Sequence, residues 1–371
     1  MTYTQIMVLA TPAFLALMAV DWWVGRKRGR DSYRLHDAMS SIGLGMVSQL
    51  ANFLTRVVGF GIYVVVYQEF AIWRLPADAA WVWVTGLLFY DLCFYWHHRA
   101  GHRVAFLWAT HAVHHQSEDY NLSTALRQPA TNWVAGWVFY LPMALAGYPP
   151  AVLVTVGLID ILYQYWIHTQ QVGRLGWADR WLNTPSNHRV HHAVNDEYLD
   201  RNYGGILIIW DRLFGTYTAE RDDVPCVYGT RLPLHSWNPL WANVQVFAAT
   251  AQESARATRW RDKLLVWLKP PDWRPAEVAL RYPKPTFDVS GVVPYDPPTA
   301  RVARSAAVML FLVTLGGVAW ALWNAHRIGD GWLAVATLLA ILALSLVGWL
   351  GAGPATSRRF EAVKANDGSL A

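Results

Sequence analysis

The residues of this chain best suited to chemistry are its histidines. Ten of the thirteen lie between residues 97 and 192; eight of those recur at helical spacings, and a ninth, His168, stands singly. Residues three or four apart on a helix share one face, with Cβ atoms about 5–6 Å apart. Each group can therefore direct two or three imidazoles at one point. Nine imidazoles are more than one metal ion needs, so the pattern predicts two metal ions close together. The nine candidate ligands are His98, His102, His111, His114, His115, His168, His188, His191 and His192.

The alternative is that these histidines are hydrogen-bonded core residues, which is our interpretation of the isolated His36, His235 and His326. Two copies of H-x-x-H-H and one H-x-x-x-H between residues 98 and 192 favour metal ligation instead. Imidazole suits iron, zinc and copper, and is a poor ligand for magnesium or calcium. His97 points to a different helical face from the first motif, so we place it outside the ligand set.

The composition is that of a membrane protein. Of 371 residues, 54% are hydrophobic, 22 are Trp and only 15% are charged, whereas about a quarter of a soluble domain is charged. A helix crosses a bilayer in about 20 apolar residues, and Trp and Tyr lie at the ends of the runs, as interface anchors do. We therefore predict an all-α, polytopic integral membrane protein. The apolar runs are 6–24, 82–95, 133–147, 151–167, 306–323 and 331–350. A further run, 42–67, is interrupted by Arg56, and is either one tilted span or a re-entrant piece.

Basic residues set the expected orientation. The first run is followed by a cluster consisting of Arg26, Lys27, Arg28, Arg30 and Arg34. By the positive-inside rule that loop is cytoplasmic. Counting spans from there, with 42–67 as one crossing, places every histidine motif at the cytoplasmic membrane surface, as a shared metal site requires. We therefore expect a bacterial inner membrane or its equivalent. The net charge of +5 does not form a nucleic-acid patch, so no nucleic-acid partner is expected.

We divide the chain into five parts. The first is a retained anchor rather than a signal peptide, because no basic residue precedes its apolar run. Two cysteines are too few for a disulfide framework and are compatible with a reducing cytoplasm. The parts are 1–37, an anchor helix and basic loop; 38–250, the membrane domain with the histidine motifs; 251–304, an irregular cytoplasmic segment rich in proline; 305–351, a transmembrane hairpin; and 352–371, a disordered tail carrying Arg358 and Arg359.

Three polar residues are candidates for holding the imidazoles in place. Asp91 shares a helical stripe with His98 and would accept a hydrogen bond from a ligand imidazole, unless it forms an ion pair with a nearby arginine. Glu118 continues the stripe of the second motif by one turn, and we assign it the same role. Asn121, like Arg127, either hydrogen-bonds ligands or substrate or caps a helix.

The remaining motif elements are less regular. His168 comes at the expected cytoplasmic end of the run 151–167, with Gln164 four residues before it on the same face. Thr184 or Ser186 could cap a helix that carries the last histidine triplet. The run 198–216 mixes glycine turns with apolar residues, and we predict a short buried helix end or a strand packed under the metal site.

These motifs resemble the fatty acid hydroxylase/sterol desaturase superfamily of integral-membrane di-iron enzymes. The resemblance rests on H-R-x-x-H and two copies of H-x-x-H-H after membrane spans. The runs 121–128, 202–216 and 237–243, with Tyr228-Gly229, are similar to the alkylglycerol monooxygenase branch in particular. The likeness covers residues 40 to 250, roughly.

In that superfamily the histidines bind two irons, and O2 attacks an unactivated C–H bond of a lipid. By motif match, the nine histidines above take those ligand roles. The sequence holds no G-x-G-x-x-G in a strand–helix context and no haem or iron–sulfur cysteine motif. The resemblance therefore implies a lipid substrate from the bilayer and a separate electron donor, either tetrahydrobiopterin or a redox protein.

Three rival functions remain open. A desaturase would use the same ligands. A zinc hydrolase would want H-E-x-x-H, which the chain lacks. A metal-binding or transport protein would place ionisable residues near the middle of the bilayer, whereas the histidines here gather at one face.

Overall fold

The computed structural model describes residues 2–352, and within them the chain is helical, with three isolated β-bridges and no strand. This confirms the predicted all-α class. The predicted tail beyond Ala352, with its two arginines, lies outside the described residues. The helices of 17 residues or more are α1 (Tyr3–Lys27), α2 (Leu35–Leu54), α4 (Ala80–Arg103), α8 (Pro150–Trp166), α11 (Pro239–Arg256), α14 (Arg301–Trp323) and α15 (Ala325–Ala352). The shorter ones are α3 (Ile62–Phe70), α5 (Ala105–His115), α6 (Leu122–Ala125), α7 (Leu141–Leu145), α9 (Pro185–His192), α10 (Ile209–Leu213), α12 (Trp260–Leu268) and α13 (Ala276–Arg281).

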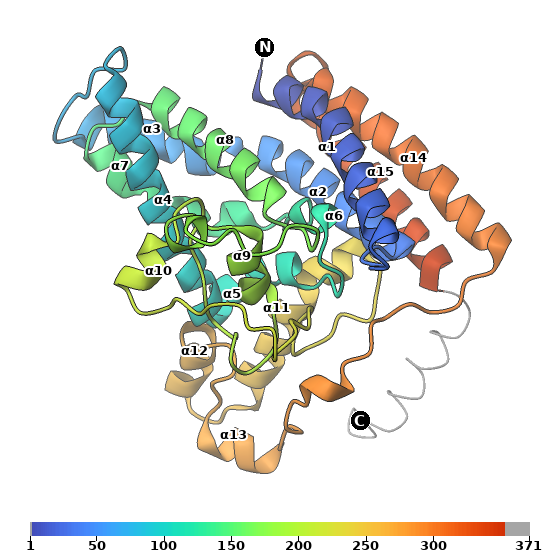
Figure 1. The fold of residues 1–371 in the computed structure, drawn as a ribbon. Helices are drawn as coiled ribbons and strands as arrows, with labels where there is room; N and C mark the ends of the chain where they lie inside the picture. The colour runs from blue at the N-terminus through green and yellow to red at the C-terminus, as the bar shows by residue number, and fades with distance from the viewer. Residues whose placement is uncertain (1, 353–371) are drawn as a thin grey trace.

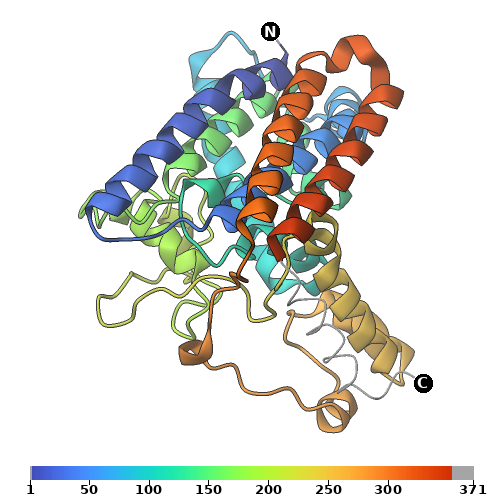
Figure 2. The ribbon, with the colours of Figure 1, turned by 90° about the vertical axis from the view of Figure 1, so that its right-hand side faces the viewer.

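Three helices, α1, α14 and α15, are long and apolar enough to cross a membrane. The outer face of α14 exposes 64% of Met309, 68% of Val313 and 62% of Trp320, which is stable only if lipid covers that face. The inner faces of α14 and α15 pack on each other and on α2 around a buried core that includes Leu50, Phe311 and Leu344 (Figures 1 and 2). The protein is therefore an integral membrane protein.

The interrupted run 42–67 becomes a bent pair. Helix α2 ends at Leu54, and a π-helix over Val57–Gly61 leads directly into α3. The segment Val57–Phe70 lies at 44° to α2. Arg56 lies at the bend, where its guanidinium binds Asp330 at the start of α15. The bend reflects the charge, because an arginine is stable only where it can reach a partner or water.

Three predicted spans differ from the structure. The run 151–167 forms α8, whose 17 residues leave it among the shorter apolar helices rather than the candidate spans. The run 133–147 is not one helix: it consists of 3₁₀ turns over Asn132–Val134 and Gly136–Tyr140, followed by the short α7. Gly136 and Pro142 account for this, because both disfavour a continuous α-helix. Helix α4 is 24 residues long but carries charged and histidine residues in its second half, so it is not among the helices apolar enough to span.

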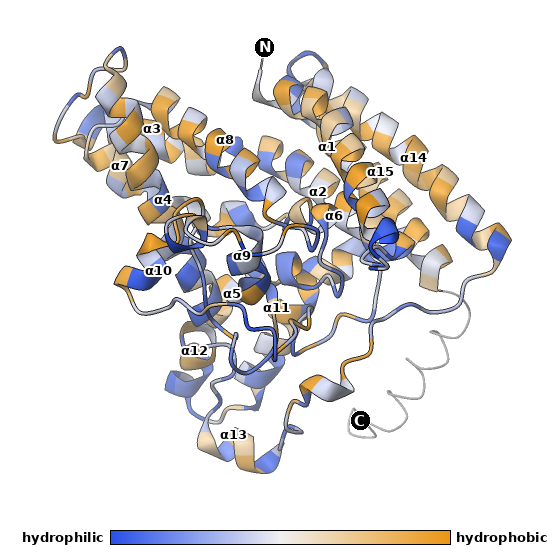
Figure 3. Cartoon of the chain, in the orientation of Figure 1, coloured by the Kyte–Doolittle hydropathy of each residue, from blue (hydrophilic) through white to orange (hydrophobic). Residues whose placement is uncertain are grey.

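The more polar part of the chain lies beyond one end of the long helices (Figure 3). There the ends of α4 and α8 meet α5, α9 and α11. The segment 270–298 is irregular apart from α13 and one 3₁₀ turn, in agreement with its proline content. The division of the chain into five parts remains a proposal.

Candidate metal centre

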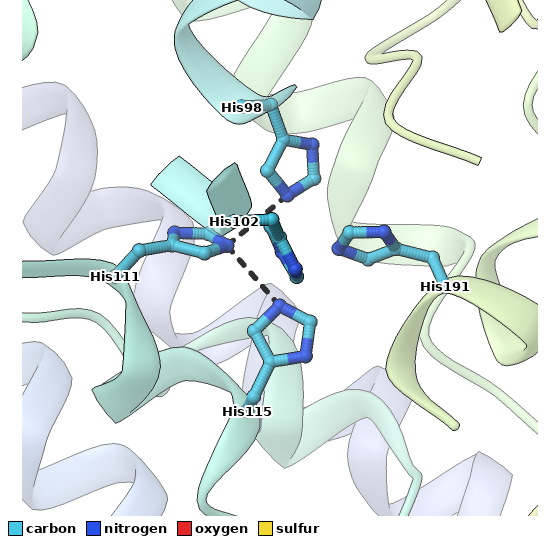
Figure 4. Close-up of side chains that lie close together, drawn as sticks. All are labelled: His98, His102, His111, His115 and His191. Atoms are coloured by element: carbon cyan, nitrogen blue, oxygen red, sulfur yellow. Dashed lines mark hydrogen bonds between the residues drawn. The ribbon is translucent and has the colours of Figure 1, made fainter. Parts of the chain in front are cut away.

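The structure brings the nine candidate histidines together in two groups. In each group, one ring nitrogen from every histidine lies within 4.8 Å of the corresponding nitrogens of the others. The five-histidine group consists of His98 and His102 from α4, His111 and His115 from α5, and His191 from α9. Their rings point toward a common centre (Figure 4). The four-histidine group consists of His114 from α5, His168 just after α8, and His188 and His192 from α9.

The two groups are adjacent because α5 and α9 contribute to both. In H-x-x-H-H the first and last histidines are four apart, which puts His111 and His115 on one face of α5 and turns His114 toward the other group. The rings of His115 and His192, one from each group, stack with centroids 4.3 Å apart. Helices α5 and α9 thus hold the two candidate metal-binding groups side by side.

Backbone carbonyls fix the direction of the imidazoles. The Nδ1 atoms of His98, His114, His168 and His191 lie 2.7–3.0 Å from the carbonyl oxygens of Tyr203, Arg127, Gln164 and Arg201, respectively. A carbonyl oxygen only accepts, so each Nδ1 is the protonated nitrogen and donates. The lone pair of each Nε2 then points away from the carbonyl and can bind a metal. Histidines that bind metals usually donate their other ring N–H to a carbonyl or carboxylate in this way.

The electrostatics also suit a metal ion. Burial, followed by the charges of neighbouring imidazoles, lowers the pKa of His111, His115 and His192 well below the ordinary value. These rings are therefore neutral at pH 7, as metal ligands must be.

The inner nitrogens fit a cation. The Nε2 atoms of His188 and His168 are only 3.0 Å apart, as two lone pairs facing a shared cation would be. The Nε2 atoms of His102 and His191 are buried and have no protein partner within the described residues. Because buried polar atoms are almost always paired, the orphaned nitrogens fit a bound metal. All-imidazole donors match iron, zinc or copper.

Asp91 does not play the role predicted for it. Its carboxylate accepts from the backbone N–H groups of Ile206 (2.7 Å) and Leu207 (3.1 Å) and from the indole of Trp210 (2.8 Å), and not from an imidazole. Gly205 lets the loop approach this closely, since a Cβ there would lie 2.9 Å from Asp91 Oδ1. Asp91 therefore fixes the loop that carries the carbonyl partner of His98.

Glu118 and Asn121 are also tied to backbone rather than to imidazoles. Glu118 accepts from the N–H of Tyr295 and pairs with Arg34 at 3.6 Å. Asn121 caps α6 by accepting from Ser123 N, which is the alternative left open for it. The Arg127 side chain is buried, and donates to the carbonyl of Val113 at 2.9 Å. These residues brace the loops around the site.

One carboxylate that was not predicted from the sequence does face a candidate metal-binding histidine. Asp200 Oδ1 lies 3.5 Å from His102 Nδ1, and Oδ2 accepts from Arg103 at 2.8 Å. Burial raises the pKa of Asp200, but the hydrogen bonds from His102 and Arg103 and the charge of Arg103 outweigh burial, so this pKa lies below its ordinary value. Asp200 is therefore ionised. Its backbone is left-handed (φ 58°), a conformation that Asp tolerates better than most residues. No spacing or motif in the sequence links Asp200 to His102.

His97 lies apart from both groups. Its ring stacks on Phe139, with centroids 5.2 Å apart, and abuts Gly136, where a Cβ would lie 2.9 Å from the ring. It thus packs the irregular 133–147 segment against α4.

A large cleft opens beside the five-histidine group. It encloses about 1520 Å³, and His102, His115 and His191 form part of its wall. Trp108, Phe139 and other apolar side chains line the same wall. A substrate with a hydrocarbon portion can therefore reach the imidazoles.

The comparisons with known proteins agree with this geometry. The fatty acid hydroxylase family model matches residues 83–216, which hold all nine histidines. Human alkylglycerol monooxygenase is 34% identical over 345 residues, covering 92% of this chain and 76% of the relative. An ornithine lipid hydroxylase of Rhizobium tropici is 30% identical over 36% of the chain and 41% of the relative. A sterol desaturase of Leptosphaeria maculans is more distant, at 26% over 37% of each. No solved structure matches the chain. With such a relative over 92% of its length, the chain belongs to the alkylglycerol monooxygenase family of membrane-bound lipid oxygenases.

Proposed function

We propose that this protein is a di-iron monooxygenase that hydroxylates a C–H bond of a glycerol ether lipid. The observation that carries the proposal is the pair of adjacent imidazole groups beside an open cleft. When bound, two irons supply the O2 activation that no side chain can perform. The reaction balances as lipid C–H, O2, two electrons and two protons giving lipid C–OH and water.

The chain's own residues position both the imidazoles and the lipid. The carbonyls of Tyr203 and Arg201 orient two imidazoles of the five-histidine group, and Asp200 orients a third. The apolar wall around Trp108 and Phe139 excludes water and holds the hydrocarbon near those imidazoles. The relatives' names support an alkylglycerol-type substrate.

The electrons come from outside the chain. The sequence has no nucleotide, haem or iron–sulfur motif, so we assign the reductant to a separate redox protein or to tetrahydrobiopterin. Either would deliver two electrons per turnover.

We further propose that the site faces the cytoplasm of a bacterial cell or its equivalent. Arg28 donates to the carbonyl of Gln171, and Arg30 to that of Gln170 at 2.8 Å. The basic loop therefore lies at the same end of the bundle as His168, two residues earlier. The positive-inside rule supports placing that end in the cytoplasm.

The first test is the metal content of the detergent-purified protein by elemental mass spectrometry. Two irons per chain are expected, and no metal even after iron reconstitution would contradict the proposal. The product formed from hexadecylglycerol then separates hydroxylation from desaturation. A hydroxylase adds one oxygen atom, whereas a desaturase, which the more distant relative exemplifies, removes two hydrogens.

A further inference from the structure

The cleft that leads to the five-histidine group is lined by more cationic than acidic side chains. Seven cationic side chains line it, against four acidic ones. The cationic residues are Arg99, Arg103, Arg201, Arg231, Arg256, Arg274 and Lys284. The acidic ones are Asp196, Asp200, Asp272 and Glu253. A cleft with this excess attracts anions, because its walls focus the field of the charges.

One face of α11 shows how the charge is distributed. Val246, Ala249, Glu253 and Arg256 all line the cleft, at helical spacing. Val246 packs on Ala109 and Ala112 of α5, the helix that holds His111 and His115. Glu253 lies seven residues farther, which is about 10 Å along the helix. Along α11 the wall of the cleft is thus apolar beside α5 and charged about 10 Å outward, whereas the Asp200–Arg103 ion pair lies at the His102 end of the cleft.

Three cations converge on Glu253. Arg274 Nε lies 2.6 Å from Oε2, and Arg256 Nη1 and Lys284 Nζ lie 3.2 Å and 3.6 Å from Oε1. The Glu253 and Arg274 side chains are only 11% and 10% exposed, whereas Lys284 is 58% exposed. The bidentate Arg274 pair explains how the segment after α12 is fixed to α11. The single negative charge of Glu253 is balanced by Arg274, so the positive charges of Arg256 and Lys284 are left without a balancing carboxylate in this cluster.

Arg256 and Lys284 are therefore available to an anion that enters the cleft. Arg256 is 29% exposed and stacks over Tyr282, 4.3 Å from the ring centroid, which holds the guanidinium in place. Arg256 and Lys284 both lie within 3.6 Å of the same oxygen, Glu253 Oε1. They are therefore close enough together to bind the oxygens of one phosphate group, which accept short, charged hydrogen bonds.

We propose that Arg256 and Lys284, beside the Glu253–Arg274 pair, form a subsite for the phosphate of a single-chain lipid whose hydrocarbon portion lies toward the five-histidine group. This inference rests on the proposed function and narrows its substrate class to phosphate-bearing ether lipids. The apolar inner part and the charged outer part of the α11 face fit the hydrocarbon and phosphate ends of such a molecule.

The test compares two lipids that differ only in phosphate: hexadecylglycerol and hexadecylglycerol phosphate. Binding to the full-length protein in a neutral detergent is measured by equilibrium dialysis, with and without iron. The wild type is expected to bind the phosphate form at least about tenfold more tightly. The double variant Arg256→Gln/Lys284→Gln is expected to lose that preference while keeping its affinity for the neutral lipid. Its melting temperature shows whether it is folded.

The matched control is Arg261→Gln/Lys269→Gln, which removes the same charges from exposed positions on and after α12, outside the cleft lining. It should keep the preference. Equal binding of both lipids by the wild type would overturn the subsite, as would an equal loss in the control. Competition by inorganic phosphate at the lipid's own concentration would overturn the lipid assignment. Because binding is measured separately from iron content and oxygenation, failure of the subsite is distinguishable from failure of the proposed function.

Discussion

At the scale of single residues, the site depends on which nitrogen of each imidazole carries the proton. Backbone carbonyls settle this for four of the nine histidines. The sequence predicted the nine imidazoles because their spacing is a side-chain signal. It could not predict the carbonyls, since every residue has one. Asp91 was misassigned because its partners, Ile206 and Leu207, lie more than a hundred residues away and use backbone atoms.

Removing one histidine from each group should separate the two metal sites. His191→Ala leaves four imidazoles in its group, and His114→Ala leaves three in the other. We expect either variant to hold about one iron or less per chain and to lose turnover by at least about a hundredfold, while remaining in the membrane. Elemental mass spectrometry and product formation measure these effects.

The control for that experiment is His326→Ala. His326 contacts Phe53 edge-on at 5.3 Å, at the end of α2 remote from the site. It should keep its metal and activity. Full metal content and activity in the His191 or His114 variant would remove that residue from the ligand set.

Arg189 and Glu220 are expected to hold α9 in place. Arg189 Nε and Nη2 lie 2.7 Å from the two Glu220 oxygens, and Nη1 donates to the carbonyls of Thr169 and Val172. Burial raises the pKa of Glu220, but the hydrogen bond and charge of Arg189 lower it more, so the net pKa lies below 4.5. The stabilisation is therefore fully present above pH 4.5 and is lost as the pH falls through the lower pKa of the folded protein.

Glu220→Gln should cost about 2 kcal/mol at pH 7, because it leaves a buried arginine without its counter-charge. The melting temperatures of wild type and variant in detergent should converge as the pH falls below 4.5. A difference independent of pH would contradict the ion-pair account. Asp223→Asn, which breaks an exposed pair with Arg221, should have little effect at any pH.

At the scale of elements, the sequence predicted a membrane-spanning helix for each long apolar run. Helices α1, α14 and α15 follow this rule, although each contains glycine and α1 also contains Pro12. The rule failed over 133–147, where Gly136 lies against the His97 ring. Such a close approach depends on tertiary packing, which hydropathy does not encode.

Gly45 of α2 is a second close approach, and it bears on the metal site. A Cβ there would overlap the carbonyl oxygen of Leu126, the residue before the carbonyl partner of His114. Gly45→Ala should therefore cost about 2 kcal/mol and reduce iron in the four-histidine group. Thermal unfolding in detergent and metal content measure the two effects.

Gly316→Ala is the matched control. It lies in α14, where a Cβ would meet no atom within 4 Å. Because alanine is the better helix former, this variant should be unchanged or up to about 1 kcal/mol more stable. If Gly45→Ala is equally harmless, the contact between α2 and Leu126 does not constrain the site.

At the scale of the whole molecule, the long helices bring to one end residues that are far apart in the chain. The basic loop after α1, His168 after α8 and the end of α4 meet there. The sequence predicted this meeting from span counting, although α4, α8 and the 133–147 segment are not among the candidate spans. The histidine groups form all the same, because their residues come from α4, α5, α9 and the position just after α8.

The proposed orientation can be measured by labelling from each side of the membrane. With Cys226→Ser as background, Arg26→Cys places a thiol at the basic end of α1, and Arg327→Cys places one in the first turn of α15. Both positions are exposed. A membrane-impermeant maleimide should reach the Arg327→Cys thiol from outside intact cells, and the Arg26→Cys thiol only in inverted vesicles, because the basic loop stays in the cytoplasm. The reverse pattern would place the metal centre outside the cell, away from a cytosolic electron donor. Labelling of both thiols from one side would mean that α14 and α15 do not cross the membrane.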